Sequence, residues 1–244
     1  MLEEVLNYYR GDNLFDEAVA VLEKDFHSYE EGCGEVYEED ELADFAWSAG
    51  VTKICIILDY CVLKTGYSGY AYDYDEDTDE YLDEPRFVDL EQNTAEVEYK
   101  VYERACEEGI DKFFVETIEL GNGVFMQERV DDILFEAMTD SELRAHYEKS
   151  FVLPDKEGQR KFNEGAQEYF EKNGMRKFCQ YFSYDVAYFL TLNLTMEELH
   201  ALYDFVDNYD INDIHSSNVG FVNGKIKIFD YCGCGSDTAS LLYA

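Results

Sequence analysis

Residues 210–233 read Asp-Ile-Asn-Asp-Ile-His-Ser-Ser-Asn-Val-Gly-Phe-Val-Asn-Gly-Lys-Ile-Lys-Ile-Phe-Asp-Tyr-Cys-Gly, a polar loop followed by two short apolar segments. Asn223-Gly224 predicts a two-residue hairpin turn, because both positions tolerate positive φ. We expect strands at 219–222 and 225–229, the second with the alternation of a half-buried strand. A hairpin of this kind brings the residues at its two open ends together.

Three oxygen-bearing side chains flank this hairpin. Asp213 and Asn218 precede the first strand, and Asp230 follows the second. Two carboxylates and an amide oxygen that converge there would suit a divalent cation. An ordinary surface hairpin, with Asp and Asn as turn formers, accounts for the same residues.

Composition sets the class of protein. The chain has 244 residues, of which 46% are hydrophobic and 16% aromatic, enough for one large domain or two small lobes. The seven cysteines are odd in number and several lie in apolar runs, which favours reduced thiols over a disulfide framework. The sequence shows no signal peptide, and no apolar run approaches about 18 residues. We therefore expect a cytoplasmic protein without a membrane partner.

The charge is extreme. Fifty-five acidic residues against nineteen basic ones give a net charge of −36. Such a chain repels nucleic acid and anionic membranes. Either the acidic residues form a solvated surface, or they imitate nucleic acid and bind a protein partner with a basic, nucleic-acid-binding surface.

The first half of the chain predicts helices and then strands. A helix over 2–25 is interrupted near residues 11–13, where Asp12 or Asn13 can cap the second segment. A small-residue turn at 48–50 then precedes strands at 51–58 and 61–64.

An acidic loop follows. Five carboxylates have the spacing of calcium-loop positions 1, 3, 5, 7 and 12: Asp73, Asp75, Asp77, Asp79 and Glu84. Thr78 stands where such a loop needs glycine, so a charged insertion explains the segment as well.

The next helix is expected at 94–109, capped by Thr94 and ended by Gly109. Its apolar face carries Val101, Tyr102, Ala105 and Cys106. Glu98, with Glu96 as the alternative, shares this inward face, and a buried carboxylate needs a partner. Gly121-Asn122-Gly123 predicts a second hairpin, with strands at 113–120 and 123–130.

Residues 131–209 read as helices. Ser141 is the expected cap of a helix over 142–149, and Asp155 or Gly158 begins another that ends near 173. Thr195 and Glu198 form a capping box for a helix over 196–208.

These marks resemble the protein-kinase-like superfamily. The spacing Asp213-x-x-x-x-Asn218 resembles the kinase catalytic loop, and Asp230-Tyr231 resembles the start of its magnesium-binding motif. Val62-Leu63-Lys64 is similar to the kinase strand that ends in the ATP-binding lysine. The order of the marks is that of a compact, C-terminally truncated member of the kind found in bacteriophages and bacteria.

The resemblance implies a fold and its domains. We expect an α+β, bilobal fold with an N-terminal helical extension at 1–44 and a kinase-like N-lobe at 45–130. That lobe holds a five-stranded antiparallel sheet and one inserted helix. A reduced, mainly helical C-lobe at 131–244 carries the catalytic-loop hairpin.

The resemblance also implies residue roles. Lys64 would bind ATP phosphates and pair with Glu98, and Asp213 would orient the attacking hydroxyl. Asn218 and Asp230 would hold Mg²⁺. The turn at Gly50 would approach the phosphates, although kinases use several glycines there. Nucleotide-binding residues at the hinge would be Gln127, Glu128 and Val130.

The function implied is an ATP- and Mg²⁺-dependent phosphotransferase that acts on a protein hydroxyl. A small-molecule acceptor is a second possibility. A third is a kinase-shaped scaffold, weak or inactive in catalysis, whose acidic surface binds and inhibits a basic protein partner in a conflict between phage and host.

Overall fold

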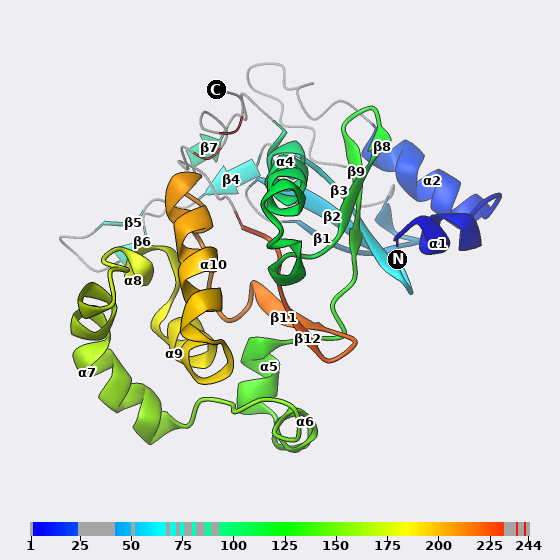
Figure 1. Ribbon diagram of the computed structural model, residues 1–244. Coiled ribbons are helices and arrows are strands. Elements are labelled where there is room, and N and C mark those ends of the chain that lie inside the picture. Colours follow the sequence, from blue (N-terminus) through cyan, green and yellow to red (C-terminus); the bar gives the residue numbers. More distant parts are fainter. Residues whose placement is uncertain are drawn as a thin grey trace. The chain divides into compact units, whose positions relative to one another are not determined.

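A computed structural model describes residues 2–23, 42–49, 52–66, 69–71, 74–75, 80–81, 86–88, 93–231, 238 and 242 (Figure 1). The fold is α+β, as the sequence predicts. The chain forms two compact units. Unit 1 comprises Met1–Tyr99 and Glu116–Arg129, and unit 2 comprises Lys100–Val115 and Val130–Ala244.

Unit 1 is built on a five-stranded antiparallel sheet with the order β1-β2-β3-β9-β8. Its strands are β1 (Ala46–Ala49), β2 (Lys53–Ile57), β3 (Cys61–Gly66), β8 (Thr117–Gly121) and β9 (Val124–Glu128). The expected five-stranded antiparallel sheet is thus confirmed. One boundary is corrected: Ser48 and Ala49 lie in β1, paired with Cys55 and Ile54, and not in a turn.

The segment between β3 and the next helix contains two short antiparallel pairs. They are formed by β4 (Gly69–Ala71) with β7 (Arg86–Val88), and by β5 (Tyr74–Asp75) with β6 (Glu80–Tyr81). Of the proposed calcium-loop positions, 73, 77, 79 and 84 lie outside the described residues.

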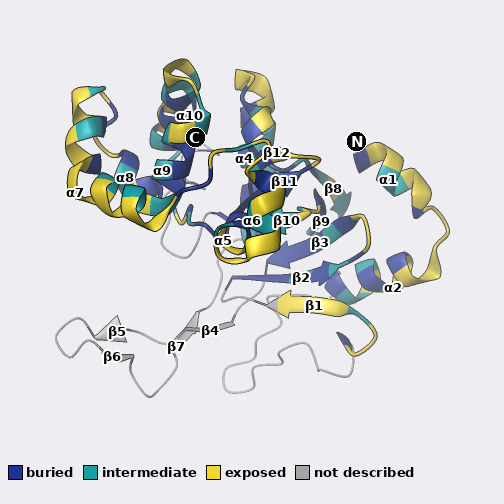
Figure 2. Cartoon of the chain, turned by 90° about the horizontal axis from the view of Figure 1, so that it is seen from below, coloured by how far each residue is buried: buried dark blue, intermediate teal, exposed yellow. Residues whose placement is uncertain are grey.

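One face of the sheet is apolar and is covered by the N-terminal helices α1 (Leu2–Tyr8) and α2 (Asn13–Leu22). Of the two expected caps, Asp12 and Asn13, it is Asp12 that caps α2, and its carboxylate accepts a hydrogen bond from Phe15 N at 3.1 Å. The residues of β2, β3 and β9 are mostly buried, while the described side chains of the edge strand β1 are exposed (Figure 2). The following residues form the core of this face: Leu2, Phe15, Ala18, Leu22, Ile54, Ile56, Leu63, Val124 and Met126.

The helix α4 (Thr94–Glu108) is attached to the sheet at its N-terminus. Asn93, and not Thr94, caps it, because Asn93 Oδ1 accepts hydrogen bonds from Ala95 N at 3.0 Å and from Gly66 N at 2.7 Å. A side chain at Gly66 would put Cβ only 2.8 Å from Asn93 Cα, so this close approach requires glycine. Thr94 instead donates its hydroxyl to Thr52 O at 2.6 Å.

The expected inward face of α4 is correct in part. Val101 and Ala105 are fully buried, whereas Tyr102 is half-buried and Cys106 is exposed. Gly109 ends the helix with a φ of +73°.

Unit 2 is mainly helical. Its helices are η1 (Asp111–Phe113), α5 (Leu134–Thr139), α6 (Ser141–Tyr147), α7 (Lys156–Lys172), α8 (Phe178–Tyr181), α9 (Tyr184–Asn193) and α10 (Met196–Asn208). Asp155 caps α7, and Thr195 with Glu198 forms the expected capping box of α10. Asp140 caps α6 in place of Ser141. The short helix η1 replaces the beginning of the strand that we expected at residue 113.

The hairpin at 219–228 is confirmed. It consists of β11 (Val219–Val222) and β12 (Lys225–Ile228), joined by Asn223 and Gly224 at φ of +49° and +67°. Together with β10 (Asp132–Ile133) it forms a three-stranded antiparallel sheet with the order β10-β11-β12. Within the described ranges, no helix is long and apolar enough to cross a membrane.

Candidate functional site

The face of the five-stranded sheet opposite α1 and α2 carries polar side chains. Residues paired across antiparallel strands project from the same face. Cys55 pairs with Lys64, and Val62 pairs with Gln127, so Lys64 and Gln127 share a face. Lys53 lies two residues before Cys55 and joins them on that face.

Glu98 of α4 is the centre of this polar cluster. Its Oε1 lies 2.5 Å from Lys53 Nζ, and its Oε2 lies 3.2 Å from Lys64 Nζ. The amide of Gln127 donates to Glu98 Oε2 at 3.3 Å and to Thr117 Oγ1 at 3.2 Å. The side chains of Lys53, Lys64 and Glu98 are 8%, 5% and 1% exposed. One carboxylate therefore orients donors from three strands, β2, β3 and β9.

The ion pair that the sequence predicts between Lys64 and Glu98 is thus present, and its role in nucleotide binding stays a prediction. Glu98 is the inward carboxylate, since Glu96 is half-buried. Sequence analysis did not single out Lys53, which lies within the strand expected at 51–58. The alternation of Lys53, Cys55 and Ile57 along β2 was the available signal.

Two residues of the expected hinge lie in a strand of the sheet. Gln127 and Glu128 belong to β9, which has β3 on one side and β8 on the other. The Glu128 amide donates to Glu116 O at 2.8 Å. These two residues pair with the neighbouring strands of the sheet, and their role in nucleotide binding stays a prediction. Val130 comes just after the sheet and is the first residue of the second segment of unit 2. Its role in nucleotide binding also stays a prediction. Gly50 lies outside the described residues.

The second group of candidate residues belongs to unit 2 and lies around β11. The side-chain amide of Asn218 donates to the backbone oxygen of Asp213 at 2.9 Å, and the Asn218 N–H donates to His215 O at 2.8 Å. The loop is anchored to the helical part of unit 2, since Ser183 N donates to Ile214 O at 2.9 Å. The loop therefore has a defined conformation that holds Asp213 and Asn218 together.

The backbone at the two aspartates is unusual. Asp213 and Asp230 have φ of +65° and +50°, in the left-handed region that residues other than glycine rarely adopt. Of the other described non-glycine residues with positive φ, Asn122 and Asn223 occupy hairpin turns where that conformation is expected, and Asp210 lies shortly after α10. Non-glycine residues in this conformation are concentrated at functional sites, so the two aspartates merit a functional test.

Asp230 follows Phe229, the residue that pairs with Asn218 at the open end of the hairpin. The Phe229 amide donates to Asn218 O at 2.9 Å, which extends the ladder of β11 and β12 by one residue. Asp230 is half-buried, and the next residue, Tyr231, is fully buried with its ring 5.5 Å from that of Phe114. This packing fixes the chain on both sides of Asp230.

The oxygens of Asn218 and Asp230 fit magnesium in their chemistry. The bond from the Asn218 amide to Asp213 leaves Oδ1 as the atom that can contact a cation. Magnesium usually takes one or two protein carboxylates and completes its shell with water and phosphate oxygens. Among the described residues, no group of three or more His, Cys, Asp and Glu side chains could hold a metal ion.

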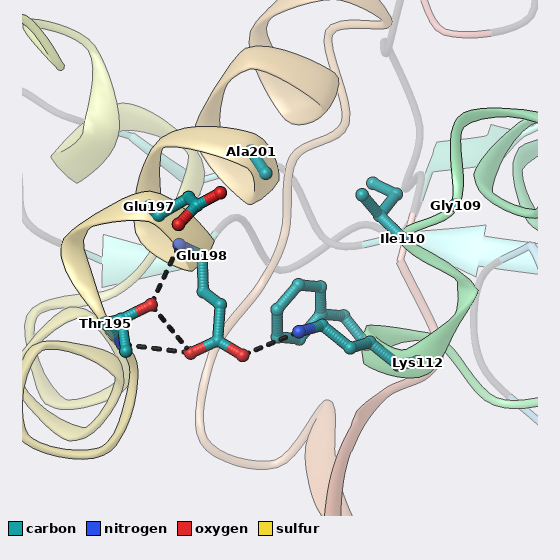
Figure 3. Close-up of a pocket in the computed structure, with 8 residues that line it drawn as sticks. Gly109, Ile110, Lys112, Thr195, Glu197, Glu198 and Ala201 are labelled. Atoms are coloured by element: carbon teal, nitrogen blue, oxygen red, sulfur yellow. Dashed lines mark hydrogen bonds and ion pairs between the residues drawn. The ribbon is translucent and has the colours of Figure 1, made fainter.

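A separate hollow of about 390 Å³ lies in unit 2 between η1 and the N-terminus of α10 (Figure 3). Ile110, Phe113 and Ala201 form its apolar part. Lys112 Nζ pairs with Glu198 Oε1 at 2.6 Å across it. None of the candidate residues lines this hollow. Its charged residues Lys112 and Glu198 already pair with each other.

No family model, curated protein sequence or solved structure matches this chain. The family suggested by the motifs therefore stays a prediction. The two polar groups, around Glu98 in unit 1 and around Asn218 in unit 2, are what a functional proposal has to explain.

Proposed function

We propose that the protein is a phosphotransferase of the protein-kinase-like type that uses ATP with Mg²⁺ and transfers phosphate to a protein hydroxyl. The observation that carries the proposal is the buried pair of Lys64 and Glu98 on the polar face of the sheet. A buried ion pair is a poor way to stabilise a sheet, because desolvation offsets most of its attraction. A role for Lys64 in binding phosphate would explain why the buried pair is present.

The proposal assigns a role to each of the candidate residues. Glu98 orients Lys64, whose ammonium group contacts phosphate oxygens. Asp213, which is exposed, orients the attacking hydroxyl or accepts its proton. Asn218 and Asp230 hold Mg²⁺, which when bound neutralises charge on the phosphates.

The test uses the full chain with ATP and Mg²⁺. Ligand at one hundred times its Kd stabilises a protein by about 2.7 kcal/mol, so the melting temperature should rise by several degrees. Labelled γ-phosphate should appear on the chain or on an added protein. We expect Asp230→Ala to abolish transfer, while Asp204→Ala, on the surface of α10, should transfer normally. Unchanged transfer by Asp230→Ala would refute the assignment.

The net charge of −36 favours a second candidate, a scaffold that binds a basic protein without turnover. The same experiment separates the two. A wild-type chain whose melting temperature does not respond to ATP and Mg²⁺, but which binds a basic protein in a salt-sensitive manner, would support the scaffold. Transfer of phosphate to a small hydroxyl compound and to no protein would favour the small-molecule acceptor.

A further inference from the structure

An aromatic cluster lies on unit 1 where the end of α1 meets the turn between β2 and β3. The ring of Tyr9 is buried against Phe15, with the two ring centroids 5.0 Å apart. The Tyr9 hydroxyl accepts a hydrogen bond from Tyr60 N at 3.3 Å, which attaches the turn to the helix. Tyr8 packs edge-on against Tyr9 at 5.1 Å and against Tyr60 at 5.0 Å. The buried Tyr9 thus holds two tyrosines at the surface, Tyr8 and Tyr60, which we call the tyrosine pair.

The tyrosine pair is open to solvent. Tyr8 is 66% exposed and Tyr60 is 55% exposed. Single apolar residues are common on protein surfaces, but exposed aromatic rings in contact with each other are typical of binding surfaces, where tyrosine is enriched. The contacts within the cluster hold both rings in place before a partner arrives, which lowers the entropy cost of binding.

Acidic side chains surround the tyrosine pair. Asp59 precedes Tyr60, Glu4 lies one helical turn before Tyr8, and both carboxylates are exposed. Burial raises the pKa of Tyr9, and the negative charge of Asp59 adds to the increase, so this carboxylate lies near the cluster. Residues 2–22 and the turn carry the acidic side chains Glu3, Glu4, Asp12, Asp16, Glu17 and Asp59. The basic side chains there are Arg10 and that of Arg129, which donates to Leu58 O at 2.9 Å and to Asp59 O at 3.2 Å.

Aromatic faces beside carboxylates suit a guanidinium group. Arginine stacks on aromatic rings and forms bidentate pairs with carboxylates, whereas lysine binds as a compact point charge. A second copy of this chain would bring another net charge of −36, and nucleic acid is also anionic, so both are repelled. An arginine-rich protein segment matches the rings and the charge together.

We infer that Tyr8 and Tyr60 form a docking surface for an arginine-rich segment of a partner protein. Its guanidinium groups stack on the two rings and pair with the carboxylates of Asp59 and Glu4. The surface uses none of the residues proposed to bind ATP or Mg²⁺, so it does not depend on whether the chain transfers phosphate.

The test is a fluorescence-anisotropy titration of the full chain at physiological ionic strength. The probes are a labelled peptide of alternating arginine and glycine and a lysine–glycine peptide of the same length and charge. We expect the arginine peptide to bind more tightly, because only guanidinium stacks well on the rings. Tyr8→Ala and Tyr60→Ala should each weaken its binding by about fivefold or more, with a smaller effect on the lysine peptide. Tyr8→Phe keeps the ring and should bind as the wild type does.

Matched controls lie in unit 2. Tyr184→Ala removes a tyrosine that is 45% exposed, and it should leave peptide binding unchanged. Asp59→Asn should weaken binding more than Asp204→Asn, which makes the same change in charge at an exposed position on α10. Thermal unfolding shows that each variant is folded, and Tyr8→Ala decides the matter should Tyr60→Ala not fold.

Three results would overturn the inference. One is a wild-type chain that binds neither peptide. Another is equal affinity for the two peptides, or equal losses in Tyr8→Ala and Tyr184→Ala, since binding would then follow net charge alone. The third is self-association of the wild-type chain in sedimentation that disappears in Tyr8→Ala, which would assign the surface to a second copy.

Discussion

The two faces of the sheet in unit 1 bury different chemistry. One face packs Ile56, Leu63 and Met126 with the apolar side chains of α1 and α2. The other packs Lys53 and Lys64 against a carboxylate from α4. An apolar face stabilises a sheet without desolvating any charge, whereas buried ions contribute little net stability. The apolar face contributes stability without buried charge, so the polar face is where a function should be sought.

The largest effect on stability should come from breaking the polar face. Glu98→Ala removes the carboxylate that two buried ammonium groups share, and loss of one partner from a buried ion pair costs roughly 3–5 kcal/mol. Chemical denaturation of the variant and the wild-type chain measures the difference. Glu96→Ala, at a half-buried position on the same helix, is the control and should change the free energy of unfolding far less. Equal losses of stability in Glu98→Ala and Glu96→Ala would contradict the placement of Glu98 as the shared partner of the two buried lysines.

Breaking the apolar face should affect stability alone. Leu22→Ala leaves a cavity in the core between α2 and the sheet, and we expect a loss of roughly 2–4 kcal/mol. The affinity for ATP and Mg²⁺, measured at a temperature where the variant is folded, should stay within about twofold of the wild-type value. A large change in affinity would mean that the two faces are not independent.

The smallest effect should come from a surface ion pair. Lys112 and Glu198 pair at 2.6 Å in unit 2, with both side chains partly exposed. The hydrogen bond from Lys112, with those from Thr195, lowers the pKa of Glu198 to about 2. Because solvent screens such pairs, Glu198→Gln should destabilise the protein by less than about 1 kcal/mol.

The pH dependence of this variant has a definite sign. A carboxyl group whose pKa is lower in the folded state stabilises the protein above its unfolded pKa, and that contribution disappears as pH falls towards the folded value. The difference in free energy of unfolding between the wild type and Glu198→Gln should therefore be largest near neutral pH and should decrease below about pH 4.5. Glu197→Gln, in the same first turn, controls for the helix dipole. If the difference in free energy of unfolding grows on acidification, the pair of Lys112 and Glu198 is not the cause of the destabilisation.

Local sequence signals predicted much of the fold. Asn223-Gly224 gave the hairpin, and the alternation of apolar residues gave the strands around Lys64, because turn chemistry and period are local properties. Caps were less predictable: Asn93 replaced Thr94, since the choice depends on where the chain enters the helix. Alternation along β2 could place Lys53 on one face of the sheet, but not its contact with Glu98, which lies forty-five residues away and meets it only when α4 packs on the sheet.

The central claim is that the polar face of the sheet binds nucleotide phosphate. Its most direct test is calorimetric titration of ATP and Mg²⁺ into the wild-type chain and into Lys64→Gln, which retains the pair between Lys53 and Glu98. We predict measurable binding by the wild-type chain and a loss of at least about tenfold in the folded variant. No heat of binding from the wild-type chain, or equal affinities for both chains, would contradict the claim.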